Sequence, residues 1–136
     1  MEKKNLDWGN IGFSYVPTDM RYVADYKNGV WGEGRLTADS TVVLNECAGI
    51  LQYCQECFEG LKAYTTEDGS IVTFRPDLNA ERMMDSARRL EMPVFPKERF
   101  SGSSGSGGKG KCGLGSALRQ RSNPVYTPLY VLLLVL

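Results

Sequence analysis

The sequence contains no histidine, and this absence removes several kinds of chemistry at once. Without an imidazole the chain has no Ser-His-Asp triad, no histidine general base and no histidine metal ligand. It also lacks an excess of either charge, with 16 basic and 16 acidic side chains, so bulk charge does not favour nucleic acid. The apolar run at 130–136 is far shorter than the roughly 20 residues that cross a bilayer. We therefore expect no nucleic-acid partner and no membrane span.

The first residues lack the uninterrupted apolar core of a secretory signal, so we expect a cytoplasmic protein whose 4 cysteines are thiols. Cys54 and Cys57 have the CxxC spacing that redox pairs and half zinc sites use. A zinc site needs four ligands, and with histidine absent only Cys47 and Cys112 remain as donors of the usual kind. We therefore expect no metal site and interpret these cysteines as structural thiols.

The 136 residues suit one globular domain, with 42% apolar and 24% charged residues, but the composition changes near residue 100. Residues 101–108 are all glycine or serine, and the whole stretch 101–136 contains no acidic residue. Such a glycine-serine segment is typical of a flexible linker. The glycine-rich part at 105–115 lacks the GxxxxGK[ST] order of a phosphate-binding loop. We predict a domain over 1–100 and a separate tail over 101–136.

In the first half of that domain, residues 20–26 are rich in β-branched and aromatic side chains and precede an Asn28-Gly29 turn. This pattern predicts a hairpin whose partner strand runs to Trp31. A further short strand is expected at 41–44. Asn45 is then the expected N-cap of a helix that reaches Cys54.

The second half predicts another hairpin, with strands at 58–65 and 71–74 joined through Glu67-Asp68-Gly69. That pairing brings Phe58 and Phe74 to the same end. A helix is expected after Asp77, and a new helical start at Pro96-Lys97. The expected buried stripe of the long helix is Ala80, Met83, Met84 and Ala87. The predicted fold class is α+β, a small antiparallel or mixed sheet with flanking helices.

Three short sequence motifs, called the family words below, carry a family resemblance: FEGLKAY at 58–64, FRPDLNAERM at 74–83 and SARRLEMP at 86–93. In this order and spacing they closely resemble the small N-terminal domain of branched-chain amino acid aminotransferases, of the pyridoxal-phosphate fold type IV. The segments 6–20 and 26–36 also resemble the family's opening. The resemblance covers residues 1–100 and stops there.

The resemblance implies roles for three residues. Arg82 is the arginine of the N-x-x-R-M word, which in the family contacts the cofactor phosphate. A guanidinium outside the apolar stripe offers a planar fork of donors that suits a phosphate, although a solvated helix arginine is the ordinary alternative. Tyr53 and Phe58 match family positions that wall the substrate's aliphatic side chain. Their ordinary alternative is core packing.

The resemblance also implies what this chain lacks. Lys62 is not the family's Schiff-base lysine, which lies in a large domain absent from the chain, so we expect no catalytic residue here and no transamination. The intact relative would be a cytoplasmic homodimer of branched-chain amino acid biosynthesis. It would use pyridoxal 5'-phosphate to pass the amino group of leucine, isoleucine or valine to 2-oxoglutarate. The alternative is a noncatalytic interaction module, or a stray fragment that binds no cofactor.

The tail contains none of the sequence motifs that follow this domain in family members. With each codon started one base later, residues 114–121 permit W-V-P-P-Y-G-S-G, and residues 121–132 permit A-T-L-Y-I-R-P-Y-M-F, which are family-like words in family order. We therefore interpret 101–136 as a frameshift product that begins at or just after Phe100. The alternative, an engineered Gly/Ser linker, accounts for 101–108 but not for the residues beyond.

Overall fold

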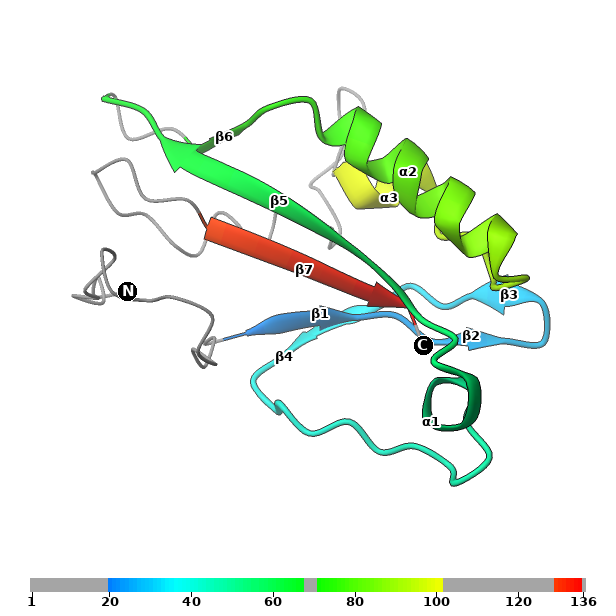
Figure 1. The fold of residues 1–136 in the computed structure, drawn as a ribbon. Coiled ribbons are helices and arrows are strands. Elements are labelled where there is room, and N and C mark those ends of the chain that lie inside the picture. The colour runs from blue at the N-terminus through cyan, green and yellow to red at the C-terminus, as the bar shows by residue number, and fades with distance from the viewer. Residues whose placement is uncertain (1–19, 68–70, 102–128, 136) are drawn as a thin grey trace.

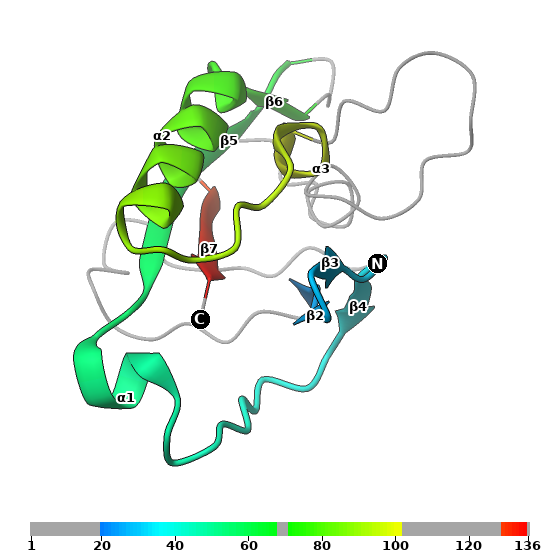
Figure 2. The same cartoon turned by 90° about the vertical axis from the view of Figure 1, so that its right-hand side faces the viewer.

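The computed structural model describes residues 20–67, 71–101 and 129–135, and its centre is a three-stranded antiparallel sheet (Figures 1 and 2). In this sheet β5 (Cys57–Thr65) lies between β6 (Ile71–Thr73) and β7 (Leu129–Val135). The helix α2 (Pro76–Arg89) runs alongside β5 in both views. Small antiparallel sheets with flanking helices confirm the predicted α+β class.

The two faces of β5 have different surroundings because successive side chains of a strand point to opposite sides. Cys57 and Leu61 are buried, at 7% and 4% exposure, and belong to the core cluster that includes α2. Phe58 and Tyr64 alternate with them and are exposed. The other buried apolar residues of this core are Ala80, Met83, Ala87, Met92, Phe95 and Phe100.

The long helix follows the predicted stripe. Ala80, Met83 and Ala87 are each 1% exposed, while Met84 is half-buried, as the spacing of a helix face requires. The helix begins at Pro76, before Asp77, so its start lies slightly upstream of the prediction. Proline suits a first helical position because its fixed φ matches the helix and its missing N–H has no partner there.

The first predicted hairpin is confirmed in β2 (Tyr26–Lys27) and β3 (Val30–Trp31), which pair antiparallel. Asn28 and Gly29 between them have φ of 52° and 83°, which are the positive angles of a tight hairpin turn. The strand expected over 20–26 is instead divided. Its first part, β1 (Arg21–Val23), pairs with β4 (Arg35–Thr37), a pairing that the sequence did not predict.

The hairpin of β2 and β3, called the N-terminal hairpin below, and the strand β1 both contact the segment that follows α2. The indole Nε1 of Trp31 donates to the carbonyl oxygen of Val94 at 2.8 Å, and its ring meets that of Phe95 edge-on at 5.0 Å. Arg99, in the short helix α3 (Lys97–Ser101), donates to the hydroxyl of Tyr22 at 2.7 Å. The helix itself confirms the predicted start at Pro96-Lys97.

Two expectations about the middle of the chain were wrong. Residues 41–44 form no strand, and Val43 is 90% exposed. An extended segment becomes a strand only when it pairs with another, and this segment has no such partner among the described residues. The helix α1 is shorter than expected and covers only Gly49–Tyr53. The side-chain oxygen of Asn45 accepts from the backbone N–H of Cys47 at 2.8 Å, which closes a local turn before the helix.

The second predicted hairpin is confirmed, with Ala63 opposite Thr73 and Thr65 opposite Ile71. Residues 68–70 of its expected turn lie outside the described ranges. Because β6 ends at Thr73, Phe74 does not reach the end of β5 that holds Phe58, and this part of the prediction was wrong.

The predicted separate tail over 101–136 contributes a strand, β7, to the sheet. This strand pairs with β5 along seven residues, from Cys57 opposite Val135 to Ala63 opposite Leu129. A strand edge offers unpaired backbone groups to any extended segment, and the apolar, partly β-branched sequence LYVLLLV suits one. The strand propensity of this segment is therefore enough to explain its pairing with β5.

Candidate functional site

The predicted phosphate ligand, Arg82, is held by a carboxylate of the sheet. Its Nε donates to Oε1 of Glu59 at 3.0 Å, and its Nη2 donates to Oε2 at 2.7 Å. Two parallel bonds of this kind make a bidentate, charge-assisted pair that fixes the guanidinium in one plane with the carboxylate. Glu59 raises the pKa of Arg82 through these hydrogen bonds and through charge attraction, so the guanidinium stays protonated.

The carboxylate of Glu59 is itself held in place. The side-chain amide of Asn79 donates to Oε2 of Glu59 at 2.9 Å and to the backbone carbonyl of Gly60 at 3.0 Å. Asn79 is 8% exposed, and the Glu59 side chain is 12% exposed, so both lie where α2 meets β5. The three side chains form a connected polar group on the helix-facing side of the strand.

Arg82 remains open to solvent in spite of this pair, with 61% of its side chain exposed. A guanidinium has five N–H donors, and the bonds to Glu59 use only those of the Nε side, leaving the Nη1 side out of the pair. Arg82 therefore faces solvent although the carboxylate of Glu59 engages it, and its guanidinium is not buried in an ion pair.

Glu59 and Asn79 were missed in the sequence, although simple spacings point to both. Glu59 lies two residues from both Cys57 and Leu61 on β5, so it shares their face, which packs against α2. Asn79 precedes Arg82 by one helical turn, so the two side chains emerge on neighbouring sides of α2.

Tyr53 and Phe58, the predicted substrate wall, are not core residues. Tyr53 ends α1 and is 84% exposed, and Phe58 is 66% exposed on the face of β5 that points away from α2. Next to Phe58 on that face, a Cβ added at Gly60 would meet no heavy atom within 4 Å. Both aromatic side chains are therefore free for contact with another molecule or domain, and core packing does not explain them.

The described part of the chain does not gather the three predicted residues into one pocket. Arg82 approaches β5 on its helix-facing side through Glu59, whereas Phe58 points to the opposite side. Lys62, which we do not expect to be catalytic, lies within β5 opposite Tyr130 of β7. A site containing all three would need further protein to enclose it.

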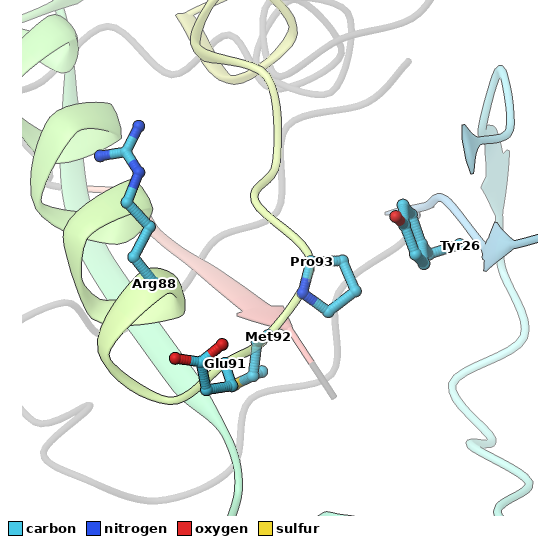
Figure 3. Close-up of a pocket in the computed structure, with 5 residues that line it drawn as sticks. All are labelled: Tyr26, Arg88, Glu91, Met92 and Pro93. Carbon is cyan, nitrogen blue, oxygen red and sulfur yellow. The ribbon is translucent and has the colours of Figure 1, made fainter. Parts of the chain in front are cut away.

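A shallow hollow of about 530 Å³ lies elsewhere, between the end of α2 and the N-terminal hairpin (Figure 3). Arg88, Glu91, Met92 and Pro93 line one side, and Figure 3 shows Tyr26 across from Pro93. None of the predicted site residues lines it. Arg88 is engaged there by Asp85 at 2.8 Å, one helical turn earlier.

The cysteines differ in exposure. Cys47 and Cys54 are exposed, whereas Cys57 is buried, and burial raises the pKa of its thiol with a smaller contribution from the charge of Glu59. Within residues 20–67, 71–101 and 129–135, histidine, cysteine and acidic side chains form no cluster of three that could hold a metal ion. Across those same ranges, every helix is too short or too polar to span a membrane.

Comparison with known proteins identifies relatives of one kind. The chain is 57% identical over 97 residues to a branched-chain-amino-acid aminotransferase of Haemophilus influenzae, and 48% identical over 97 residues to that of Helicobacter pylori. It is 44% identical over 97 residues to the methionine aminotransferase BCAT4 of Arabidopsis thaliana. Each match covers 71% of this chain but only 27% to 28% of the relative. No family model matches the chain.

These relatives are all named aminotransferases, and the chain is therefore similar to a segment of enzymes of that class. More narrowly, the resemblance to branched-chain aminotransferases seen in the three sequence words is confirmed. The chain spans little more than a quarter of the length of these relatives.

Proposed function

We propose that residues 1–100 are the small domain of an enzyme that transfers the amino group of leucine, isoleucine or valine to 2-oxoglutarate with pyridoxal 5'-phosphate. One observation carries the proposal. Arg82, in the N-x-x-R-M word, presents a fixed and still exposed guanidinium, held by Glu59 at 2.7 and 3.0 Å. An ordinary solvated arginine would have no such partner, and a fully buried pair would have no donors left.

The donor set at Arg82 fits a phosphate group. One N–H of Nη1 and the second N–H of Nη2 point outside the pair with Glu59 and would hold two phosphate oxygens by charge-assisted hydrogen bonds. The bound cofactor would supply an electron sink for the carbon that carries the amino group. Arg82 itself would bind and orient, and would move no proton, because its pKa lies above the ordinary value.

Tyr53 and Phe58 would form part of the wall around the substrate's aliphatic side chain. Their exposure supports this role, since both rings lie uncovered and Gly60 leaves space beside Phe58. An aromatic wall favours an apolar substrate side chain because its contact removes apolar surface from water. One relative is named a methionine aminotransferase, after an amino acid with an unbranched apolar side chain, which supports a wall that accepts more than one apolar shape.

The rest of the enzyme would lie in a large domain that supplies the cofactor-bound lysine, and in a second subunit of a cytoplasmic homodimer. The chain contains no residue to which we assign proton transfer, so we propose that it does not transaminate alone. We further propose that residues 101–136 result from a frameshift after Phe100. The DNA sequence around codon 100 tests this directly, because one inserted or deleted base there would restore the family words.

The test of function is an enzyme expressed with the reading frame restored after Phe100, called the frame-restored enzyme below. It should convert 2-oxoglutarate to glutamate when supplied with leucine. Arg82→Ala should weaken pyridoxal phosphate binding roughly tenfold to a hundredfold, because a charge-assisted contact is lost. Arg88→Ala, on the same helix and similarly exposed, is the matched control and should bind the cofactor as the parent does. Equal cofactor affinity in the Arg82→Ala variant would remove the phosphate assignment.

A further inference from the structure

We propose that Glu59 is a positioning residue, which together with Asn79 fixes the guanidinium of Arg82 in the orientation that receives a phosphate. This inference rests on the proposed phosphate role of Arg82. The observation behind it is the chain of contacts that joins Arg82, Glu59 and Asn79, of which only Arg82 is substantially exposed.

The geometry leaves the guanidinium little freedom. Both oxygens of Glu59 are engaged, at 3.0 Å by Nε and at 2.7 Å by Nη2 of Arg82, so rotation about the last side-chain bonds would break at least one contact. An arginine side chain otherwise samples many rotamers in water, and ordering them opposes binding. With the Nε side occupied, the plane and direction of the Nη1 donors are set before any anion arrives.

Asn79 extends this restraint to the backbone. Its amide nitrogen reaches both Oε2 of Glu59, at 2.9 Å, and the carbonyl of Gly60, at 3.0 Å. Gly60 belongs to β5, the central strand of the sheet, and Asn79 is buried on α2. The position of the arginine donors is therefore tied to the junction of α2 and β5, where both elements contribute to the buried core.

Glu59 also has an opposite effect, because its negative charge repels a phosphate. A glutamate that served only to attach α2 to β5 would lower the affinity of Arg82 for anions, and its neutralisation would raise that affinity. If Glu59 is a positioning residue, its neutralisation lowers the affinity of Arg82 for phosphate, because the loss of the orientation outweighs the loss of the repulsion. The direction of the change in Glu59→Gln therefore separates the two roles.

The experiment titrates the full 136-residue chain with inorganic phosphate and with pyridoxal phosphate, and follows the Nε–H signal of Arg82 by NMR. Glu59→Gln should weaken phosphate binding by roughly three- to tenfold, because one of the two oriented bonds is lost. Asp85→Asn removes the carboxylate of an exposed arginine pair on the same helix and should leave binding unchanged. In the parent, the Nε–H signal should stay at its paired position at saturating phosphate.

A second variant covers the case in which Glu59→Gln fails to fold. Arg82→Lys keeps the charge at a position where the side chain is 61% exposed, so folding tolerates it, but an ammonium has no fork to orient. It should lose phosphate affinity nearly as much as Arg82→Ala. Full retention of affinity in Arg82→Lys, tighter binding in Glu59→Gln, or release of the Nε–H signal by phosphate would each overturn the positioning role.

The proposed function fails in a distinguishable way. If Arg82→Ala binds phosphate as well as the parent, or if the parent shows no phosphate binding, the phosphate role of Arg82 is wrong and the role of Glu59 falls with it. If Arg82→Ala weakens binding while Glu59→Gln does not, only the positioning role is wrong.

Discussion

The thiol sulfur of Cys57 lies 3.4 Å from the thioether sulfur of Met83, so a side chain of β5 meets one of α2 at the centre of the core. Met83 is 1% exposed and is the largest fully buried side chain among the described residues. Met83 follows Arg82 directly on α2, and Cys57 shares the face of Glu59 on β5. Apolar packing thus holds the helix that carries Arg82 against the strand that carries Glu59.

Met83→Ala should therefore destabilise the fold by about 2 to 5 kcal/mol, the range for truncating a buried methionine to alanine. Leu78→Ala, on the same helix at 40% exposure, should cost only about 1 kcal/mol because less apolar surface is lost. Urea unfolding of both variants measures the difference. Equal losses would mean that Met83 is not at the centre of the core.

The cysteines should differ in reactivity. Cys47 and Cys54 are exposed and should react readily with a thiol reagent near pH 8, whereas Cys57 should be protected in the folded chain. Two causes act together at Cys57, because burial blocks access and raises the thiol pKa, which lowers the fraction of reactive thiolate. Mass spectrometry of peptides after timed alkylation checks this. Labelling of Cys57 as fast as Cys54 would contradict the burial of that side chain.

The pKa of Asp77 should lie well below the ordinary value of an aspartate. Arg75 holds its carboxylate by hydrogen bonds, the shortest at 2.7 Å, and lowers the pKa of Asp77 to about 2. The pKa of an aspartate in an unfolded chain is about 3.9. The stability that ionised Asp77 contributes to the fold is therefore complete above that pH and is lost as the pH falls towards 2. NMR titration should find the low value in the parent and a value nearer the ordinary one in Arg75→Ala. An unchanged midpoint in that variant would remove Arg75 as the cause.

Tyr53→Ala and Phe58→Ala should affect amino acids selectively in the frame-restored enzyme. Each removes apolar wall, so the Michaelis constant should rise more for leucine than for glutamate, and kcat/KM for leucine should fall roughly tenfold or more. Steady-state kinetics with both amino acids make the measurement. Tyr26→Ala, another partly exposed tyrosine outside the proposed wall, serves as the control. Equal losses with leucine and glutamate would show that the two rings do not contact the side chain.

Local patterns predicted the local structure. The spacing of Ala80, Met83 and Ala87 fixes which side of α2 is buried, and Asn28-Gly29 closes its hairpin because both residues accept positive φ. These features depend on neighbours in sequence, which is why they could be read without a structure. The failure at 41–44 is of another kind, since β-forming residues become a strand only when another strand is available.

The contacts that make up the candidate site are less local. Arg82 and Glu59 are 23 positions apart, and the sequence alone does not determine which strand residue a helix arginine will reach. The family words contained both residues, but only the packing of α2 on β5 shows that they bind each other. Pairing of β7 with β5 was unforeseen for the same reason, because a strand edge accepts partners from anywhere in the chain.

The proposed function requires that residues 1–100 form a working small domain of a branched-chain aminotransferase. The most direct measurement joins these residues to the remaining part of the Haemophilus influenzae relative, with which the chain shares 57% identity over 97 residues, and assays leucine-dependent formation of glutamate from 2-oxoglutarate. This hybrid does not depend on the origin of residues 101–136. We expect it to bind pyridoxal phosphate and to transfer the amino group, with Arg82→Ala lowering cofactor affinity. A folded hybrid that neither binds the cofactor nor forms glutamate would contradict the account.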